Sequence, residues 1–106
     1  MAVVELTDQS FPSTVLESTR PVLVDFYASW CGPCRLMAPM MTWADETYGE
    51  RLLVTKMDVD ANPATRDAYR LQGIPCLVIF RNSEEVARSE GALSQGQLRT
   101  FIDPNL

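Results

Sequence analysis

Histidine is absent from this sequence of 106 residues, and cysteine is scarce, with three in all. A structural zinc ion needs four ligands, which are most often cysteine and histidine side chains. Here only a carboxylate could complete such a set, and none stands at metal-ligand spacing from the cysteines. An odd number of cysteines also does not fit the disulfide framework of small secreted domains. We therefore expect neither a metal site nor an extracellular disulfide scaffold.

Basic runs and long apolar runs are absent too. The net charge of −5 and the lack of lysine or arginine clusters argue against a nucleic-acid partner. No apolar stretch approaches the length of a membrane span, and residues 1–5 lack the features of a secretory signal, so we expect no membrane partner. Hydrophobic content of 46% and charged content of 22% are ordinary for a globular protein. We expect one domain, residues 1–106, in a reducing compartment such as the cytoplasm.

Two cysteines stand at the start of a predicted long helix. The apolar residues 22–28 are typical of a buried strand, Trp30-Cys31-Gly32-Pro33-Cys34 follows, and a helical pattern continues to about Tyr48. Pro33 suits the first turn of a helix, where its missing N–H has no intrahelical partner to lose. The exposed amides and the helix dipole there favour a thiolate. One helical turn also lets the two sulfurs meet, so the pair can cycle between dithiol and disulfide.

The phase of this helix predicts different roles for the two sulfurs. The apolar stripe that should face the core consists of Met37, Met40, Met41, Ala44 and Tyr48. At about 100° per residue, Cys34 lies about 60° from the centre of the stripe and Cys31 about 120° from it. We therefore predict that Cys31 is the accessible nucleophile and that Cys34 is the shielded sulfur that attacks second.

Asp25 is the one charged residue within the predicted strand 22–28. An unpaired buried carboxylate is costly and usually responds with a raised pKa. Because the strand leads directly into the cysteine turn, we interpret Asp25 as a proton-transfer group for Cys34, with structural hydrogen bonding as the alternative. Lys56 could partly balance its charge, and the alternative is a lysine whose stem runs along the surface to water.

The remaining segments alternate between strands and helices. We expect, in order, a strand over residues 3–6, a helix capped by Ser10, the strand and helix already described, a strand over 52–59, a helix from Asn62 to about Leu71 ended by Gly73, strands over 76–80 and 85–90, and a helix capped by Ser94 and Gln97. This order predicts an α/β fold with parallel pairing first and antiparallel pairing afterwards. The central strands lack polar alternation, so helices should cover both faces of the sheet.

Several motifs together resemble the thioredoxin family across essentially the whole chain. They are residues 24–34, Ala38-Pro39, Lys56-Met57-Asp58-Val59-Asp60, Gly73-Ile74-Pro75 and Gly91-Ala92-Leu93. The resemblance implies a five-stranded mixed sheet flanked by four helices, with a cis Pro75 facing the cysteines. It implies that Cys31 attacks a client disulfide and that Cys34 resolves the mixed disulfide. It further implies that Asp25 and Lys56 manage the Cys34 proton.

The resemblance also implies a docking surface and a set of partners. The docking residues would be Trp30, Gly32, Pro33, Ile74, Pro75, Gly91 and Ala92, of which Gly32 and Pro33 would also tune the redox chemistry. A thioredoxin reductase would supply electrons to a monomeric carrier without a cofactor. Clients would be of the ribonucleotide reductase, peroxiredoxin and methionine sulfoxide reductase types. A plastid stroma would suit such a protein as well as the cytoplasm.

Four residues depart from the family pattern: Tyr27 for tryptophan, Cys76 for threonine, Ser83 for glycine and Glu90 for an apolar residue. Cys76 is most simply a small buried residue, and the alternative is an auxiliary thiol near the redox pair. Glu90 adjoins the implied docking surface, where a charge could alter partner choice.

An oxidase or isomerase would favour a histidine between the cysteines, so Gly32-Pro33 points to a reductant. A non-catalytic role as a binding subunit is the other alternative.

Overall fold

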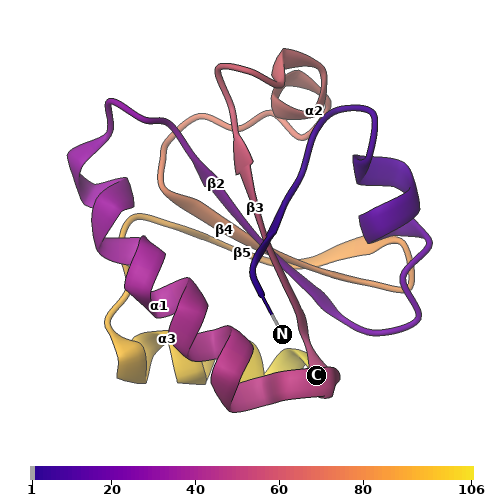
Figure 1. Ribbon diagram of the computed structural model, residues 1–106, viewed down its shortest axis with the longest axis vertical. Coiled ribbons are helices and arrows are strands. Elements are labelled where there is room, and N and C mark those ends of the chain that lie inside the picture. Colours follow the sequence, from indigo (N-terminus) through magenta and orange to yellow (C-terminus); the bar gives the residue numbers. More distant parts are fainter. Residues whose placement is uncertain (1) are drawn as a thin grey trace.

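A computed structural model describes residues 2–106 of the chain. Within these residues, the strands are β1 (Val4–Glu5), β2 (Val22–Tyr27), β3 (Leu53–Asp58), β4 (Cys76–Arg81) and β5 (Glu84–Glu90). They form one five-stranded sheet in the order β1-β3-β2-β4-β5 (Figure 1). Strand β3 pairs in parallel with β1 and β2, whereas β4 pairs antiparallel with β2 and β5. The predicted order of parallel and antiparallel pairing is confirmed.

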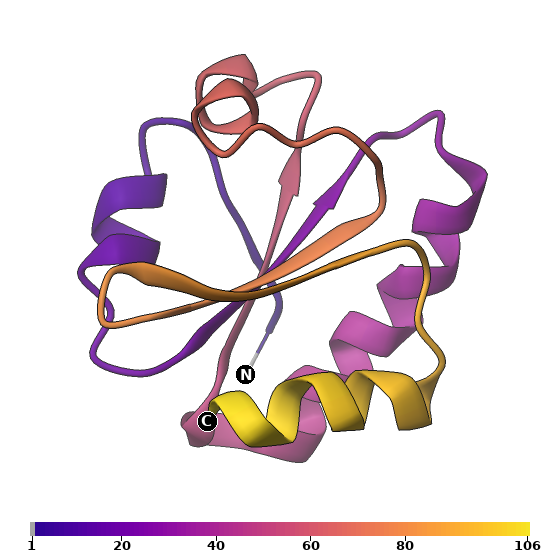
Figure 2. The same cartoon turned by 180° about the vertical axis from the view of Figure 1, so that it is seen from behind.

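Three α-helices and one π-helical turn flank the sheet in the described residues, which confirms the expected four helices. They are η1 (Pro12–Leu16), α1 (Gly32–Tyr48), α2 (Pro63–Ala68) and α3 (Gln95–Ile102). Two short 3₁₀ turns, η2 (Gly49–Arg51) and η3 (Asp103–Asn105), follow α1 and α3. Figures 1 and 2 show α1 and α3 on one side of the strands and η1 and α2 on the other. None of these helices, between residues 2 and 106, is long and apolar enough to cross a membrane.

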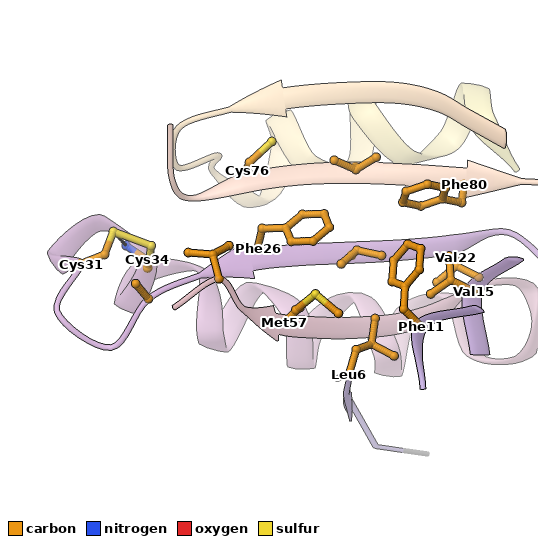
Figure 3. Close-up of a cluster of buried hydrophobic side chains, with 14 residues drawn as sticks. Leu6, Phe11, Val15, Val22, Phe26, Cys31, Cys34, Met57, Cys76 and Phe80 are labelled. Carbon is orange, nitrogen blue, oxygen red and sulfur yellow. Dashed lines mark hydrogen bonds between the residues drawn. A yellow bond between two sulfur atoms is a disulfide. The ribbon is translucent and has the colours of Figure 1, made fainter. Parts of the chain in front are cut away.

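The sheet separates two buried clusters, because successive side chains of a strand point to opposite faces. Leu23 of β2 packs with the apolar stripe of α1, including Met37 and Met41. Its neighbours Val24 and Phe26 pack on the other face with Phe11, which lies at the start of η1. Figure 3 shows this second cluster as a continuous row, with the Cys31–Cys34 pair at one end. The redox pair is therefore anchored to the core rather than carried on a free loop.

The helix caps match the sequence only in part. Ser94 and Gln97 form the predicted capping box of α3. The predicted Ser10 cap of the first helix is wrong. The Ser10 hydroxyl oxygen instead accepts a hydrogen bond from the Thr7 N–H at 2.9 Å. Such a local side-chain to backbone bond competes with capping. Helix η1 begins after Phe11, which supplies no side-chain cap.

Helix α2 is capped by a residue far away in the sequence. Asn62 occupies the predicted N-cap position, but its amide makes hydrogen bonds to the backbone of Asp8 and Asp58 instead. The Asp8 carboxylate accepts the free N–H groups of Ala64 and Thr65 at 3.2 and 2.9 Å. These contacts fix the start of α2 to the N-terminal segment. The predicted extension of the helix to Leu71 is also wrong, because α2 ends at Ala68.

The β4–β5 hairpin keeps a tight turn despite the serine that stands where the family favours glycine. Asn82 and Ser83 have φ values of 54° and 69°, the positive angles that a two-residue type I′ turn requires at both positions. The Ser83 hydroxyl donates a hydrogen bond to the Leu16 carbonyl oxygen at the end of η1. That contact gives the serine a role that glycine could not fill.

Candidate redox site

Cys31 and Cys34 form a disulfide at the N-terminus of α1, with their Cα atoms 5.3 Å apart. Cys31 is the N-cap residue, and the Cys34 N–H donates a hydrogen bond to its Sγ atom at 3.3 Å. Pro33 lies in the first turn of the helix as predicted. A helix amide and the positive end of the helix dipole therefore act on the Cys31 sulfur, and both would stabilise a thiolate there after reduction.

The predicted difference in exposure between the two cysteines is wrong. Cys31 is 4% exposed and Cys34 is 6% exposed, so neither is the more accessible in the disulfide form. The helical phase places Cys31 away from the core side of α1, but the loop before β4 covers it from another direction. The Sγ atom of Cys31 lies 3.9 Å from the Ile74 carbonyl oxygen. Phase within one helix carries no information about a loop more than 40 residues later in the chain.

The loop that covers Cys31 contains the cis Ile74–Pro75 peptide bond, as the family resemblance implied. The Gly91 N–H donates to the Pro75 carbonyl oxygen at 2.8 Å, and Gly91 has a φ of 92°, a conformation suited to glycine. Trp30 precedes the disulfide and is 68% exposed. Its indole N–H donates to the Asp60 carboxylate at 2.7 Å. Of the implied docking residues, Ile74 therefore contacts Cys31, and Gly91 is tied to the neighbouring Pro75.

Asp25 lies on β2 and is buried. It is 3% exposed, and its Oδ1 atom has no hydrogen-bond partner among residues 2–106. Burial raises the pKa of this carboxyl to about 7, although the positive charge of Lys56 opposes the shift and Glu5 adds to it. A carboxyl with this pKa can release and take up a proton near neutral pH. It shares a pocket of about 300 Å³ with Cys34.

Lys56 lies beside Asp25 in the sheet but forms its ion pair elsewhere. The two residues are in register on β2 and β3. However, the Lys56 ammonium lies 3.8 Å from a Glu5 carboxylate oxygen and 5.9 Å from the centre of the Tyr27 ring. Lys56 therefore acts on Asp25 only at longer range, by opposing the rise of the Asp25 pKa. The direct ion-pair partner of Lys56 is Glu5.

Sequence reasoning missed Glu5 and the contacts of Tyr27 at this site. The Tyr27 hydroxyl donates to both Glu5 carboxylate oxygens, at 3.0 and 2.9 Å. Strand β1 places Glu5 in register with Lys56. Predicting that the first strand pairs in parallel with the third strand would have placed Glu5 beside Lys56. Glu5, Lys56 and Tyr27 thus lie on the same face of the sheet as Asp25.

Cys76, the third cysteine, starts β4 directly after Pro75 and is fully buried. Burial raises the pKa of its thiol to about 11. Because the thiolate is the reactive form, a thiol with this pKa is a poor nucleophile at neutral pH. The position therefore favours the interpretation of Cys76 as a packing residue.

Cys76→Thr is expected to change the rate of disulfide reduction by less than about twofold, because the buried thiol stays protonated. The measurement is turbidimetric reduction of insulin by the variant and the unmodified chain, at matched folded fractions. Ellman's reagent should find two fast thiols and one slow thiol in the reduced unmodified chain. A large loss of turnover in a folded variant would instead make Cys76 a functional thiol.

Comparison with known proteins places these features in one family. The family model described as Thioredoxin matches residues 2–104. The thioredoxin of Buchnera aphidicola subsp. Baizongia pistaciae is 46% identical over 101 residues, covering 95% of this chain and 93% of the relative. The thioredoxin of Acidithiobacillus ferridurans is 44% identical over 105 residues, covering 99% and 97%. Thioredoxin X, chloroplastic, of Arabidopsis thaliana is 43% identical over 101 residues, covering 93% and 56%.

Proposed function

The chain belongs to the thioredoxin family, whose members are protein-disulfide oxidoreductases, and we propose a role in that chemistry for each residue of the site. Cys31 is the nucleophile that attacks a client disulfide, and Cys34 is the resolving thiol. The observation that carries these roles is the position of Cys31 at the α1 N-cap, where its sulfur accepts the Cys34 N–H. Exposure does not separate the two sulfurs, so the assignment depends on this stabilisation of the Cys31 thiolate.

The reaction proceeds in two exchanges. The Cys31 thiolate attacks one sulfur of the client disulfide, forms a mixed disulfide with it, and releases the other client sulfur as a thiolate that takes up a proton. The Cys34 thiolate then attacks the Cys31 sulfur, which restores the Cys31–Cys34 disulfide and releases the second client thiol. In total, the client gains two electrons and two protons, and the cysteine pair is oxidised.

Asp25 is proposed to accept the proton that Cys34 must lose before the second exchange. Its pKa of about 7 suits this step, and the pocket that it shares with Cys34 gives the two groups a common space. Lys56 lowers the pKa of Asp25 from a distance while it remains paired with Glu5. Lys56 is therefore a positioning and charge-tuning residue, and its ammonium does not touch the sulfur chemistry.

The surface around the disulfide is proposed to hold the client as an extended segment. Its residues are Trp30, Ile74, Pro75, Gly91 and Ala92, with Gly32 and Pro33 tuning the redox pair. The apolar character of Trp30 and Ile74 suits contact with unfolded or loop segments that carry a disulfide. The Gly91–Pro75 backbone bond holds the two docking loops together.

Disulfide clients and a reductase are the partners that membership of the family implies. We propose that a thioredoxin reductase donates the electrons and that clients are of the ribonucleotide reductase, peroxiredoxin and methionine sulfoxide reductase types. We also propose that residues 1–106 act as one monomeric domain in the cytoplasm or a plastid stroma.

The reduction potential of the Cys31–Cys34 pair tests the direction of this chemistry. We expect the pair to be more reducing than glutathione, because no histidine between the cysteines gives the thiolate additional stabilisation. The measurement is equilibration with glutathione redox buffers, followed by thiol trapping and mass spectrometry, with a Cys31→Ser, Cys34→Ser double variant as the blank. A potential more oxidising than that of glutathione would make the chain an oxidase or isomerase.

A further inference from the structure

Two carboxylates lie on either side of the cysteine pair. Asp60, which follows β3, is held beside Trp30 by the indole N–H at 2.7 Å. Glu90 is the last residue of β5, two strands away on the other side of β2. A Cβ atom built on Gly73 would lie 3.2 Å from the Glu90 Oε2 atom, so this carboxylate rests over the loop that leads to Ile74 and Pro75. Both acidic groups therefore border the surface proposed to hold the client.

The nearby cations have other direct partners, although Arg88 still attracts Glu90 at longer range. Arg88 on β5 is paired with the Glu85 carboxylate at 2.7 Å. Arg35 on α1 lies on the helix side of the disulfide, where its guanidinium donates to the Ser29 carbonyl oxygen. Asp60 and Glu90 are themselves exposed, and neither belongs to an ion pair in the described part of the chain. The net charge of −5 adds a negative background to the whole molecule.

We propose that Glu90 and Asp60 form an acidic bracket that selects clients with lysine or arginine close to the reducible disulfide. The proposal rests on the role of the site in protein-disulfide reduction and names the class of substrate that the site prefers. Charges at the rim of an interface act mainly on association rate and on discrimination between partners. A client segment passing between Trp30 and the Gly73–Pro75 loop would bring its flanking side chains toward both carboxylates.

Glu90→Gln tests the proposal while preserving the size of the side chain over Gly73. The substrates are two synthetic peptides with the same internal disulfide, one flanked by lysines and the other by glutamates. The measured quantity is the ratio of kcat/KM for the basic peptide to that for the acidic peptide. At low ionic strength, we expect the variant to lower this ratio about three- to fivefold. The effect should shrink at physiological salt, where the Debye length is about 8 Å.

Glu17→Gln is the matched control, since it makes the same change in net charge. Glu17 follows η1, which Figure 1 shows far from the start of α1. This control should leave the ratio unchanged, and Asp60→Asn combined with Glu90→Gln should lower it further. An unchanged kcat/KM ratio in Glu90→Gln, or an equal change in Glu17→Gln, would overturn the proposal. If the unmodified chain reduced neither peptide nor insulin, the proposed function itself would be overturned.

Discussion

Cys31→Ser is expected to abolish disulfide reduction, and Cys34→Ser is expected to accumulate a mixed disulfide with the client. The first variant lacks the nucleophile, so turnover should fall by at least about 1000-fold. The second variant keeps a Cys31 sulfur at the helix N-cap and can complete the first exchange. It has no thiol within reach for the second exchange, because Cys76 is buried and its pKa is raised to about 11.

Mass spectrometry under non-reducing conditions measures this difference directly. Each variant is incubated with a client disulfide, and the adduct should appear at the sum of the two masses for Cys34→Ser alone. A Cys34→Ser, Cys76→Thr double variant is the control, and it should trap the same amount of adduct. Equal trapping by Cys31→Ser and Cys34→Ser would contradict the assignment of the two roles.

Local sequence patterns predicted the parts of this fold that depend on short-range order. The apolar run of β2 and the helical phase of α1 were both found, because burial on both faces and a 3.6-residue period leave clear patterns. The stripe containing Met37 and Met41 faces the core as predicted. Asp25 was identified from a single charge in an apolar strand, and the structure buries it at a pocket that Cys34 also lines.

The features that the sequence did not reveal are contacts between distant segments. Asp8 caps α2 from more than 50 residues away, and Glu5 takes the Lys56 ammonium. The loop at Ile74 covers Cys31 and removes the expected difference in exposure. Each depends on strand order or on a loop path, and neither leaves a periodic pattern in the chain. Family motifs supplied the position of Pro75 beside the cysteines, which periodicity alone could not.

Asp25→Asn is expected to stabilise the oxidised protein, and more strongly at pH 8 than at pH 4. The folded pKa of Asp25 is about 7, above the usual 3.8 of a free carboxyl, so the folded state holds the proton more tightly. Between these two values the unfolded state binds fewer protons, and the free energy of unfolding therefore falls as pH rises. The destabilisation caused by ionising Asp25 in the folded protein is absent below about pH 4, grows between pH 4 and pH 7, and is complete above pH 7. A shift of this size corresponds to about 4 kcal/mol.

Denaturant unfolding of the oxidised protein at pH 4, 6 and 8 measures this dependence. The stability gain of Asp25→Asn should rise by about 4 kcal/mol from pH 4 to pH 8, whereas Glu46→Gln, an exposed change on α1, should show no such trend. The variant should also reduce insulin at least about tenfold more slowly at neutral pH, because Cys34 loses its proton acceptor. A gain that stays constant with pH would show that Asp25 ionises alike in the folded and unfolded chains. A pH-dependent gain with unchanged turnover would show that the Asp25 carboxyl is buried with a raised pKa but takes no part in the reaction.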